Sequence, residues 1–472
     1  MKKYPVGLIG LAVMGQNLAR NLASKGFPVM TYNRTTQTAE EFIKAYGHEG
    51  LDFCTTLKDF LASLERPRKI ILMVKAGAPV DETLNALLPF LEKGDVLIDG
   101  GNSNYHDTIR RSQSMPKGIE FVGMGVSGGE EGALRGPSLM PGCNKEAWKV
   151  IRPLMQKIAA KDFSGKPCVT HVGPDGAGHY IKMVHNGIEY AVMQMMAEAY
   201  DMLKRMYRLP PQRISTIFAD YNQGKLKSFL FEIAVPVLSR KDDLKSGYLI
   251  DSILDKAGQK GTGRWVALDA LEHGAALPTL TEAVYARSLS SFKKERLLLA
   301  SLYKRTIPKP PIPLNEFIIV LENALYAGMI SCYAQGFELI RITAEDQKWK
   351  LNFAEIARIW EGGCIIRADL LNFLHEAFLI EKGKPVHLFT IPSIRHALNK
   401  DIPSLRAITS VAVQYGVPAL AFGTALGYFE SMTSAILPAQ FIQGLRDFFG
   451  AHTYERIDRK GSFHTPWSNL NL

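Results

Sequence analysis

The sequence of 472 residues lacks a membrane-spanning segment, a signal peptide and paired cysteines. It has no run of about 18 or more apolar residues, the length that a membrane-spanning helix needs. Its N-terminus enters a short apolar segment without a signal-peptide pattern. Its five cysteines are far apart and form no Cys-x-x-Cys pair, so they indicate neither a disulfide framework nor a cysteine metal site. These absences predict a cytoplasmic protein without a membrane span.

The charges are not gathered into blocks of one sign. The chain has 56 basic and 46 acidic residues and a formal net charge of +10, which attracts anions. Because the basic residues are spread along the chain, small anions such as a phosphate-bearing cofactor are favoured over nucleic acid. The alternative to an enzyme is an anion- or nucleic-acid-binding protein that keeps a nucleotide-binding fold without catalytic activity.

Residues 1–177 alternate short apolar strands with helical stretches. Strand-like runs cover residues 6–10, 27–32, 69–74 and 95–99, and helical periodicity follows at 14–24. This alternation predicts an α/β Rossmann-type domain with a parallel sheet and helices on both faces. Glycine-rich turns are expected after strands, at residues 100–101 and 123–129.

The remaining chain carries mainly helical spacing. Residues 178–434 are predicted to form a large all-helical domain, with long helices over 180–208 and 315–342. A weak similarity at an offset of 137 positions, such as Asn186 with Asn323, suggests a duplicated helical unit in which Glu189 becomes Tyr326. Residues 435–472 begin with a helix-like segment and end in a polar tail without an evident core of its own.

A dinucleotide-binding turn follows the first strand. Residues 10–15 read Gly-Leu-Ala-Val-Met-Gly, with Ala12 in the middle glycine position, and they open a helix whose N–H groups can receive a pyrophosphate. The second strand ends at Asn33-Arg34-Thr35, where an NAD site would place an acidic residue. A neutral, a positive and a hydroxyl side chain suit a 2′-phosphate, so the sequence predicts NADP as the cofactor.

A short polar stripe interrupts an otherwise apolar helix. Lys182, His185, Asn186 and Glu189 lie at i, i+3, i+4 and i+7, which places them on one helix face. The stripe then continues into apolar residues, so it indicates the wall of a pocket more than a solvated face. Burial tunes the pKa values of lysine and glutamate for proton transfer, which favours acid/base chemistry beside a hydride acceptor. The sequence shows no metal-ligand spacing, and we expect no metal.

Eight segments together resemble the 6-phosphogluconate dehydrogenase family, in the β-hydroxyacid dehydrogenase superfamily. They are GLAVMGQN (10–17), Asn33-Arg34-Thr35, DGGNS (99–103), GMGVSGG (123–129), KMVHNGIEY (182–190), QKGTG (259–263), GGCIIR (362–367) and RDFFGAHTY (446–454). The resemblance runs nearly end to end. It implies oxidative decarboxylation of 6-phosphogluconate to ribulose 5-phosphate and CO2 with reduction of NADP, in the pentose phosphate pathway.

The resemblance also implies the site residues. NADP would lie over Gly10, Ala12, Val13, Met14 and Gly15, with Asn33, Arg34 and Thr35 around its 2′-phosphate and Val74, Lys75 and Asn102 on the nicotinamide side. The substrate would contact Asn102, Ser127, Gly128, Gly129, Lys182, His185, Asn186, Glu189 and Tyr190. Its phosphate would be held by Lys260, Thr262 and Arg287, joined by Arg446 and His452 from the partner subunit of a homodimer.

In the mechanism that the resemblance implies, neutral Lys182 takes the proton from the C3 hydroxyl as hydride leaves C3. The 3-keto acid then loses CO2 while protonated Lys182 supports the developing enolate, and Glu189 protonates C1 of the enediol.

Two residues depart from the family pattern: Glu361 stands where arginine is expected, and Asn104 replaces a frequent acidic residue. The nearest alternative is a β-hydroxyacid dehydrogenase acting on an unphosphorylated acid, which would lack the phosphate-holding residues and end earlier.

Overall fold

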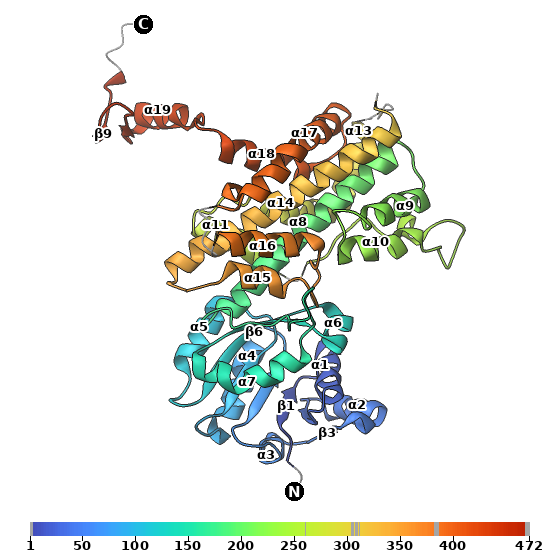
Figure 1. Cartoon of the computed structure of the whole chain (residues 1–472), viewed down its shortest axis with the longest axis vertical. Helices are drawn as coiled ribbons and strands as arrows, with labels where there is room; N and C mark the ends of the chain where they lie inside the picture. Colours follow the sequence, from blue (N-terminus) through green and yellow to red (C-terminus); the bar gives the residue numbers. More distant parts are fainter. Residues whose placement is uncertain are drawn as a thin grey trace. The chain divides into compact units, whose positions relative to one another are not determined.

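The computed structural model describes residues 3–259, 261–303, 306, 310, 312–381 and 387–467. It divides into two compact units, Met1–Leu426 and Gly427–Leu472. The larger unit contains a sheet with its covering helices and then a helical region, drawn from blue to orange in Figure 1.

The sheet of the larger unit has seven strands in the order β3-β2-β1-β4-β5-β6-β7. All neighbouring pairs are parallel except β6 with β7, which is antiparallel. The strand bounds are β1 Val6–Ile9, β2 Val29–Tyr32, β3 Leu51–Phe53, β4 Lys69–Leu72, β5 Val96–Asp99, β6 Glu120–Ser127 and β7 Ser138–Gly142. The strand order reverses between β1 and β4, and in open sheets a ligand crevice lies beyond the carboxyl ends of the strands at such a point.

Helices cover both faces of the sheet (Figure 1). Their bounds are α1 Val13–Ser24, α2 Thr36–Tyr46, α3 Leu57–Ala62, α4 Ala78–Leu87, α5 Tyr105–Ser114, α6 Gly129–Arg135 and α7 Lys145–Ile158. Side chains from alternate positions of the same strands feed two separate cores: Leu8 belongs to one and Ile9 to the other. A parallel sheet buried on both faces is the Rossmann-type arrangement that the strand–helix alternation predicts, and this prediction is confirmed.

The glycine-rich segment 123–129 is not the turn that the sequence analysis expects. Residues 123–127 belong to the buried strand β6, and only Gly128 and Gly129 turn into α6. The glycines serve packing: a Cβ on Gly123 would lie 2.4 Å from Thr108 Cγ2, and one on Gly125 would lie 2.5 Å from the Cβ of Lys182. The missing side chain of Gly123 makes room for Thr108 of α5, and that of Gly125 lets the helix that carries Lys182 approach the backbone of β6.

That helix is α8, Ala177–Met206, the first of the helical region. The others in this region are α9 Pro211–Tyr221, α10 Phe229–Ser239, α11 Thr262–Glu272, α12 Pro278–Ser291, α13 Lys293–Leu302, α14 Leu314–Asp346, α15 Phe353–Ile359, α16 Asp369–Ile380, α17 Pro392–Gln414 and α18 Leu420–Thr433. The prediction of a helical region with two long helices is confirmed by α8 and α14. Their first residues are 137 positions apart, the offset of the weak internal similarity.

Helix α14 is long and apolar enough to span a membrane, with a mean hydropathy of 1.5 over its most apolar window. In this structure it is a core helix, because it packs against α8 and α17 and 67% of that window is buried inside the protein. Glycines again allow close contact, since a Cβ on Gly336 would lie 2.5 Å from Ile188 Cδ1.

A buried carboxylate connects the sheet region to the helical region. Asp269 of α11 accepts hydrogen bonds from the hydroxyls of Tyr105 and Tyr180, each at 2.7 Å, and it is 3% exposed. Tyr105 begins α5 and Tyr180 lies in α8, so one side chain holds three helices together. Each phenol satisfies one oxygen of a carboxylate that burial would otherwise penalise.

The smaller unit contains α19 (Ala439–Gly450), β8 (Tyr454–Glu455) and β9 (Ser462–Phe463), with β8 and β9 antiparallel. Its centre is polar. Asp447 accepts hydrogen bonds from the backbone N–H of Thr453 and Thr465 and from the indole of Trp467, and it pairs with His464. The sequence analysis finds no apolar core here, and the structure shows a carboxylate in its place.

We expect Gly125→Ala to destabilise the larger unit by about 1–3 kcal/mol, the usual cost of overpacking, because its methyl group meets Lys182 and the carbonyl oxygen of Gly178. Thermal unfolding followed by circular dichroism checks this. Gly423→Ala is the matched control: it lies in α18 with open space around its Cβ position, so its stability should be unchanged or slightly raised. Equal melting temperatures for Gly125→Ala and the parent protein would contradict this explanation of the glycines in β6.

Candidate active site

The turn between β1 and α1 is shaped for close approach of a ligand. Gly10 has φ +100°, and a Cβ there would lie 2.5 Å from the carbonyl oxygen of Met73. A Cβ on Gly15 would lie 1.9 Å from the carbonyl oxygen of Gly10, so α1 starts directly against the turn. Ala12 caps α1 without a side-chain hydrogen bond. The first N–H groups of the helix therefore have no side-chain partner at the cap and can bind a pyrophosphate.

A cavity of about 570 Å³ opens beside this turn, at the carboxyl ends of β1, β2 and β4. Asn33 Oδ1 accepts a hydrogen bond from the N–H of Leu11, which joins the end of β2 to the turn, and Arg34 is exposed. The lining includes seven residues of the predicted cofactor site, Gly10, Ala12, Asn33, Arg34, Thr35, Val74 and Lys75. Glu82 of α4 also lines the cavity, but the side chains at the end of β2 are neutral or basic. These side chains and the uncapped N–H groups of α1 fit a dinucleotide with a 2′-phosphate.

Asn102 follows β5 in a left-handed conformation, with φ +53°. Its side chain accepts a hydrogen bond from the N–H of Val126 at 3.3 Å and donates one to the carbonyl oxygen of the same residue at 3.4 Å. These bonds place Asn102 beside Ser127, the last residue of β6. Gly128 and Gly129 come next, with φ +119° and +63°, so this turn also depends on glycine.

The polar stripe of α8 lies against the end of β6. Lys182 Nζ is 3.1 Å from Ser127 Oγ, 3.1 Å from His185 Nδ1 and 2.5 Å from Asn186 Oδ1. Ser127 Oγ is 3.3 Å from His185 Nε2, and Glu189 Oε2 is 3.8 Å from His185 Nδ1. The structure thus brings together the four polar residues of the stripe, and Lys182 is only 5% exposed.

Burial sets the protonation of this cluster. It lowers the pKa of Lys182, although the charge of Glu189 acts in the opposite direction. It lowers the pKa of His185 well below its usual value, and Lys182 adds to this effect. It raises the pKa of Glu189 against the opposing charges of Lys182 and Arg287. A lysine that releases its proton easily and a glutamate that retains its proton form a base and an acid on one helix face.

Residues from α11 and α12 extend the cluster. Thr262 Oγ1 accepts a hydrogen bond from Asn186 Nδ2 at 3.1 Å. The guanidinium of Arg287 stacks on the ring of Tyr190 at 3.4 Å from its centroid and donates to the carbonyl oxygen of Gly258. Lys260 lies outside the described residues. Arg446 and His452 belong to the smaller unit, where both are exposed.

The structure adds residues that the sequence analysis does not identify. Cys364 is fully buried close enough to Lys182 for each to influence the pKa of the other. Its motif is part of the family resemblance, but no spacing relates it to residue 182. Asp99 and Arg111 lie buried beneath the Asn102 loop, and an acidic residue followed by two glycines at a strand end is the one sequence signal for them.

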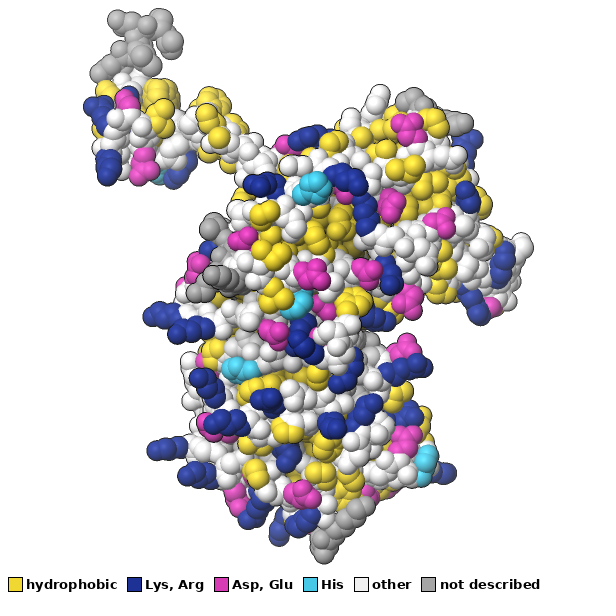
Figure 2. Space-filling model, in the orientation of Figure 1, with side chains coloured by type: hydrophobic (Ala, Val, Ile, Leu, Met, Phe, Trp, Pro, Cys, Tyr) yellow, Lys and Arg dark blue, Asp and Glu magenta, His cyan; other side chains and the backbone are white. Residues whose placement is uncertain are grey.

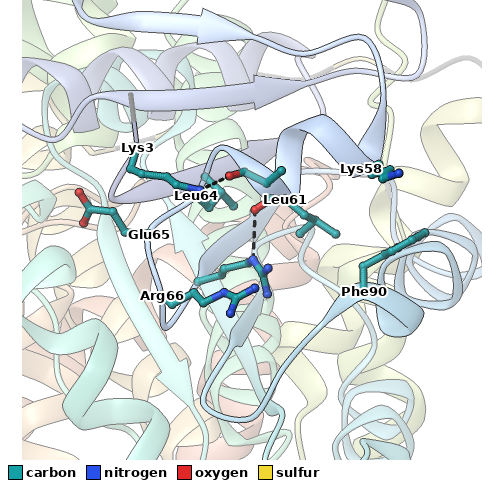
Figure 3. Close-up of a pocket in the computed structure, with 9 residues that line it drawn as sticks. Lys3, Lys58, Leu61, Leu64, Glu65, Arg66 and Phe90 are labelled. Carbon is teal, nitrogen blue, oxygen red and sulfur yellow. Dashed lines mark hydrogen bonds between the residues drawn. The ribbon is translucent and has the colours of Figure 1, made fainter. Parts of the chain in front are cut away.

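A second hollow, of about 750 Å³, lies at the opposite edge of the sheet (Figure 3). It is lined by residues that precede β1 and β4, among them Lys3, Arg66 and Arg68. These cations already have partners: Lys3 donates to the carbonyl oxygen of Ala62, Arg66 pairs with Glu92, and Arg68 pairs with Asp95. Because its lining residues precede the strands, the hollow lies at their amino ends. The cofactor turn and Lys182 lie at the opposite, carboxyl ends of the strands.

Comparison with known proteins supplies the family. Residues 5–173 match the family described as the NAD binding domain of 6-phosphogluconate dehydrogenase, and residues 178–467 match its C-terminal domain. The chain is 47% identical to the NADP(+)-dependent, decarboxylating 6-phosphogluconate dehydrogenase of Bacillus subtilis, covering 99% of this chain and 100% of that protein. It is 45% identical to the decarboxylating 6-phosphogluconate dehydrogenase of Escherichia coli K12, with the same coverage.

A solved structure of Plasmodium falciparum 6-phosphogluconate dehydrogenase superposes with a TM-score of 0.95 at 44% identity, over 98% of this chain and 100% of that one. That protein is described in its apo form, with its cofactor NADP+ and with its substrate 6-phosphogluconate. The similarity covers both the sheet region and the helical region, as the end-to-end resemblance of the sequence predicts. The chain belongs to the 6-phosphogluconate dehydrogenase family.

Proposed function

We propose that this protein catalyses the oxidative decarboxylation of 6-phosphogluconate to ribulose 5-phosphate and CO2 with reduction of NADP, a step of the pentose phosphate pathway. The observation that carries the proposal is the buried Lys182, held between Ser127 and Asn186 at the carboxyl edge of a dinucleotide-binding sheet. The relatives named for this reaction match the chain over nearly its whole length. That coverage leaves the unphosphorylated-acid alternative without support.

Lys182 is the base of the first step. Its neutral amine keeps two N–H groups, which suit the acceptors Ser127 Oγ and Asn186 Oδ1. His185 Nδ1, also 3.1 Å from the amine, can donate its proton to Asn186 Oδ1 instead, which leaves the lone pair of Lys182 to take the proton of the C3 hydroxyl. Bound NADP supplies the acceptor for the hydride that leaves C3. Since burial has already lowered the pKa of Lys182, the neutral form is reached at a lower pH than for an exposed lysine.

The same residues serve the later steps. Oxidation at C3 produces a β-keto acid, whose carbonyl group accepts the electrons released as CO2 leaves. Lys182, now protonated, stabilises the negative charge that develops on this oxygen. Glu189, which retains its proton because burial raises its pKa, then protonates C1 of the enediol. C1 of the enediol is C2 of the substrate, next to the oxidised C3. A base and an acid on the same helix face can thus act one after the other on neighbouring carbons.

The remaining residues would bind and orient the substrate. Asn102, Ser127, Gly128, Gly129, His185, Asn186 and Tyr190 surround the reacting carbons in our proposal, and Lys260, Thr262 and Arg287 hold the phosphate. Thr262 begins α11, so the N-terminus of that helix can add to the attraction for an anion. Arg287 is kept in place by its stacking on Tyr190. We also propose that the protein is cytoplasmic.

We further propose a homodimer in which Arg446 and His452 complete the phosphate site of the partner. Helix α19 presents an exposed apolar stripe at helical spacing, formed by Phe441, Ile442, Leu445, Phe448 and Phe449. Figure 2 shows hydrophobic side chains at the surface of this unit, beside basic and acidic ones. Apolar patches of this kind mark protein interfaces, and a second copy of the chain is the occupant we propose.

We expect Lys182→Met to reduce kcat by roughly 10²- to 10⁴-fold, the contribution of general base catalysis, while 6-phosphogluconate still binds. The measurement is absorbance of reduced NADP with 6-phosphogluconate and no added metal. Lys204→Met in the same helix is the control, because that lysine pairs with Asp251 outside the site and its loss should leave kcat unchanged. In the parent protein, kcat/KM should rise with pH as Lys182 loses its proton. Because the pKa of Lys182 is lowered, the midpoint of this rise should lie below pH 10.5, the ordinary lysine value. A retained kcat in Lys182→Met, or a midpoint at the ordinary lysine value, contradicts the assignment.

Arg34→Ala tests the 2′-phosphate contact. Loss of a charged hydrogen bond costs about 1.5–3 kcal/mol, so the KM for NADP should rise roughly 10- to 150-fold while the KM for NAD changes little. Arg20→Ala, a change in α1 at an arginine paired with Glu49, provides the control and should affect neither KM. Equal increases for both cofactors would refute a 2′-phosphate role for Arg34.

Mixed dimers test the contribution of the partner subunit. Lys182→Met and Arg446→Ala chains should each be nearly inactive alone. If Arg446 acts across the interface, a mixed dimer contains one site with both native residues, and random pairing should restore about a quarter of the parent activity. Co-expression and size-exclusion chromatography followed by the NADP assay measure this. Absence of any recovery in dimers shown to be mixed would place Arg446 in its own subunit's site.

A further inference from the structure

Arg111 of α5 is a buried arginine that the proposed mechanism does not use. Its side chain is 1% exposed. Nε and Nη2 hold the two carboxylate oxygens of Asp81 at 2.9 and 2.8 Å, and Nη2 also donates to the carbonyl oxygen of Gly77 at 3.0 Å. Nη1 donates to Ser103 Oγ at 3.2 Å and lies 3.6 Å from Asp99 Oδ2. The guanidinium therefore spans two separate segments of the chain.

Those two segments are the loops that follow β4 and β5. Gly77 caps α4 and comes two residues after Lys75, and Asp81 lies in the first turn of that helix. Asp99 ends β5, and Ser103 follows Asn102. Val74, Lys75 and Asn102 are the residues that we place on the nicotinamide side of the cofactor. Arg111 connects the two loops through these hydrogen bonds and is not among the residues that line the cofactor cavity.

The second loop needs such support because its conformation is strained. Asn102 has φ +53°, which non-glycine residues adopt at a cost. Asp99 holds the loop through Gly101 N–H at 2.9 Å and Ser103 Oγ at 2.6 Å, and Asp99 is itself fully buried. Arg111 supplies the positive charge next to that carboxylate. Asn102 in turn bonds to Val126, whose neighbour Ser127 contacts Lys182.

We infer that Arg111 is a positioning residue: by joining Gly77 and Asp81 to Asp99 and Ser103, it sets the separation of the two loops that flank the nicotinamide and hence the distance over which hydride is transferred. The inference rests on the proposed function. A planar guanidinium is required, since it can hold a carboxylate with two parallel bonds and still reach both loops, whereas an ammonium group is a single point charge. Displacement of reacting groups by about 1 Å can cost about 100-fold in rate.

The test compares Arg111→Lys with Arg68→Lys. Arg68 is also buried, bonds to Asp95 at 2.6 Å and precedes β4, but it lies at the opposite edge of the sheet from the cofactor turn. The three readouts are kcat with 6-phosphogluconate and NADP, the kinetic isotope effect with substrate deuterated at C3, and the dissociation constant of NADP. Thermal unfolding of both variants shows whether the losses of stability are comparable.

For Arg111→Lys we expect kcat to fall roughly 10- to 100-fold and the isotope effect to rise, because hydride transfer becomes slower relative to the other steps. The dissociation constant of NADP should change less than about threefold, since the 2′-phosphate and pyrophosphate contacts remain. Arg68→Lys should keep the parent kcat and isotope effect at a similar loss of stability. Ser103→Ala removes the hydroxyl that links Arg111 to Asp99 and leaves both charged residues in place. It should therefore show a smaller fall in kcat and a smaller rise in the isotope effect. This variant serves as the test if Arg111→Lys does not fold.

Two results would overturn the inference. One is an unchanged isotope effect in Arg111→Lys, or in Ser103→Ala where the former is unfolded. The other is an equal change in Arg68→Lys, which would mean that general destabilisation is the cause. Failure of the proposed function is distinguishable, because the parent protein itself would then not reduce NADP with 6-phosphogluconate, and the positioning role would fall with it.

Discussion

The arrangement of the site depends on contact between the backbones of β6 and α8. A Cβ on Gly178 would lie 2.1 Å from the carbonyl oxygen of Gly123 and 2.3 Å from that of Met140, so the first turn of α8 sits directly on β6 and β7. Gly125 provides the same clearance one turn later, under Lys182. Glycine has no Cβ and is the only residue that allows such an approach. Main-chain packing therefore fixes the position of the helix that carries Lys182.

This close packing also explains the electrostatics of the site. A helix pressed against a sheet excludes water, so Lys182, His185 and Glu189 are all shifted toward their neutral forms by burial. Ser127 and Asn186 provide neutral hydrogen-bond partners for the amine, and no carboxylate forms a close salt bridge with it among the described residues. A tight ion pair would have kept Lys182 protonated. Neutral partners preserve its capacity to accept a proton.

Local spacing is sufficient to predict the parts of the candidate site that lie within one helix or at one strand–helix junction. The turn from Gly10 to Gly15 and the stripe from Lys182 to Glu189 are such parts, because helix periodicity and a strand–turn–helix context fix which residues adjoin. The prediction of a turn over residues 123–129 is wrong for residues 123–127, because in a sequence the glycines that permit packing cannot be distinguished from the glycines that form a turn. Arg111 was missed because its partners come from loops that only the sheet brings together. Arg287 is identified only through the family resemblance, because no spacing in the sequence relates it to the other residues of the site.

The contacts of Asn186 have a consequence for how substrate range can change in this fold. Asn186 bonds to Lys182 on one side and to Thr262 of α11 on the other, whereas the base itself is anchored to β6. In the mechanism that we propose, chemistry and recognition therefore belong to different layers of the protein: β6 and α8 carry out the oxidation, and α11 and α12 hold the far end of the substrate. On that proposal, substitutions in α11 and α12 would change which acid is bound, while the contact of Lys182 with β6 would stay as it is.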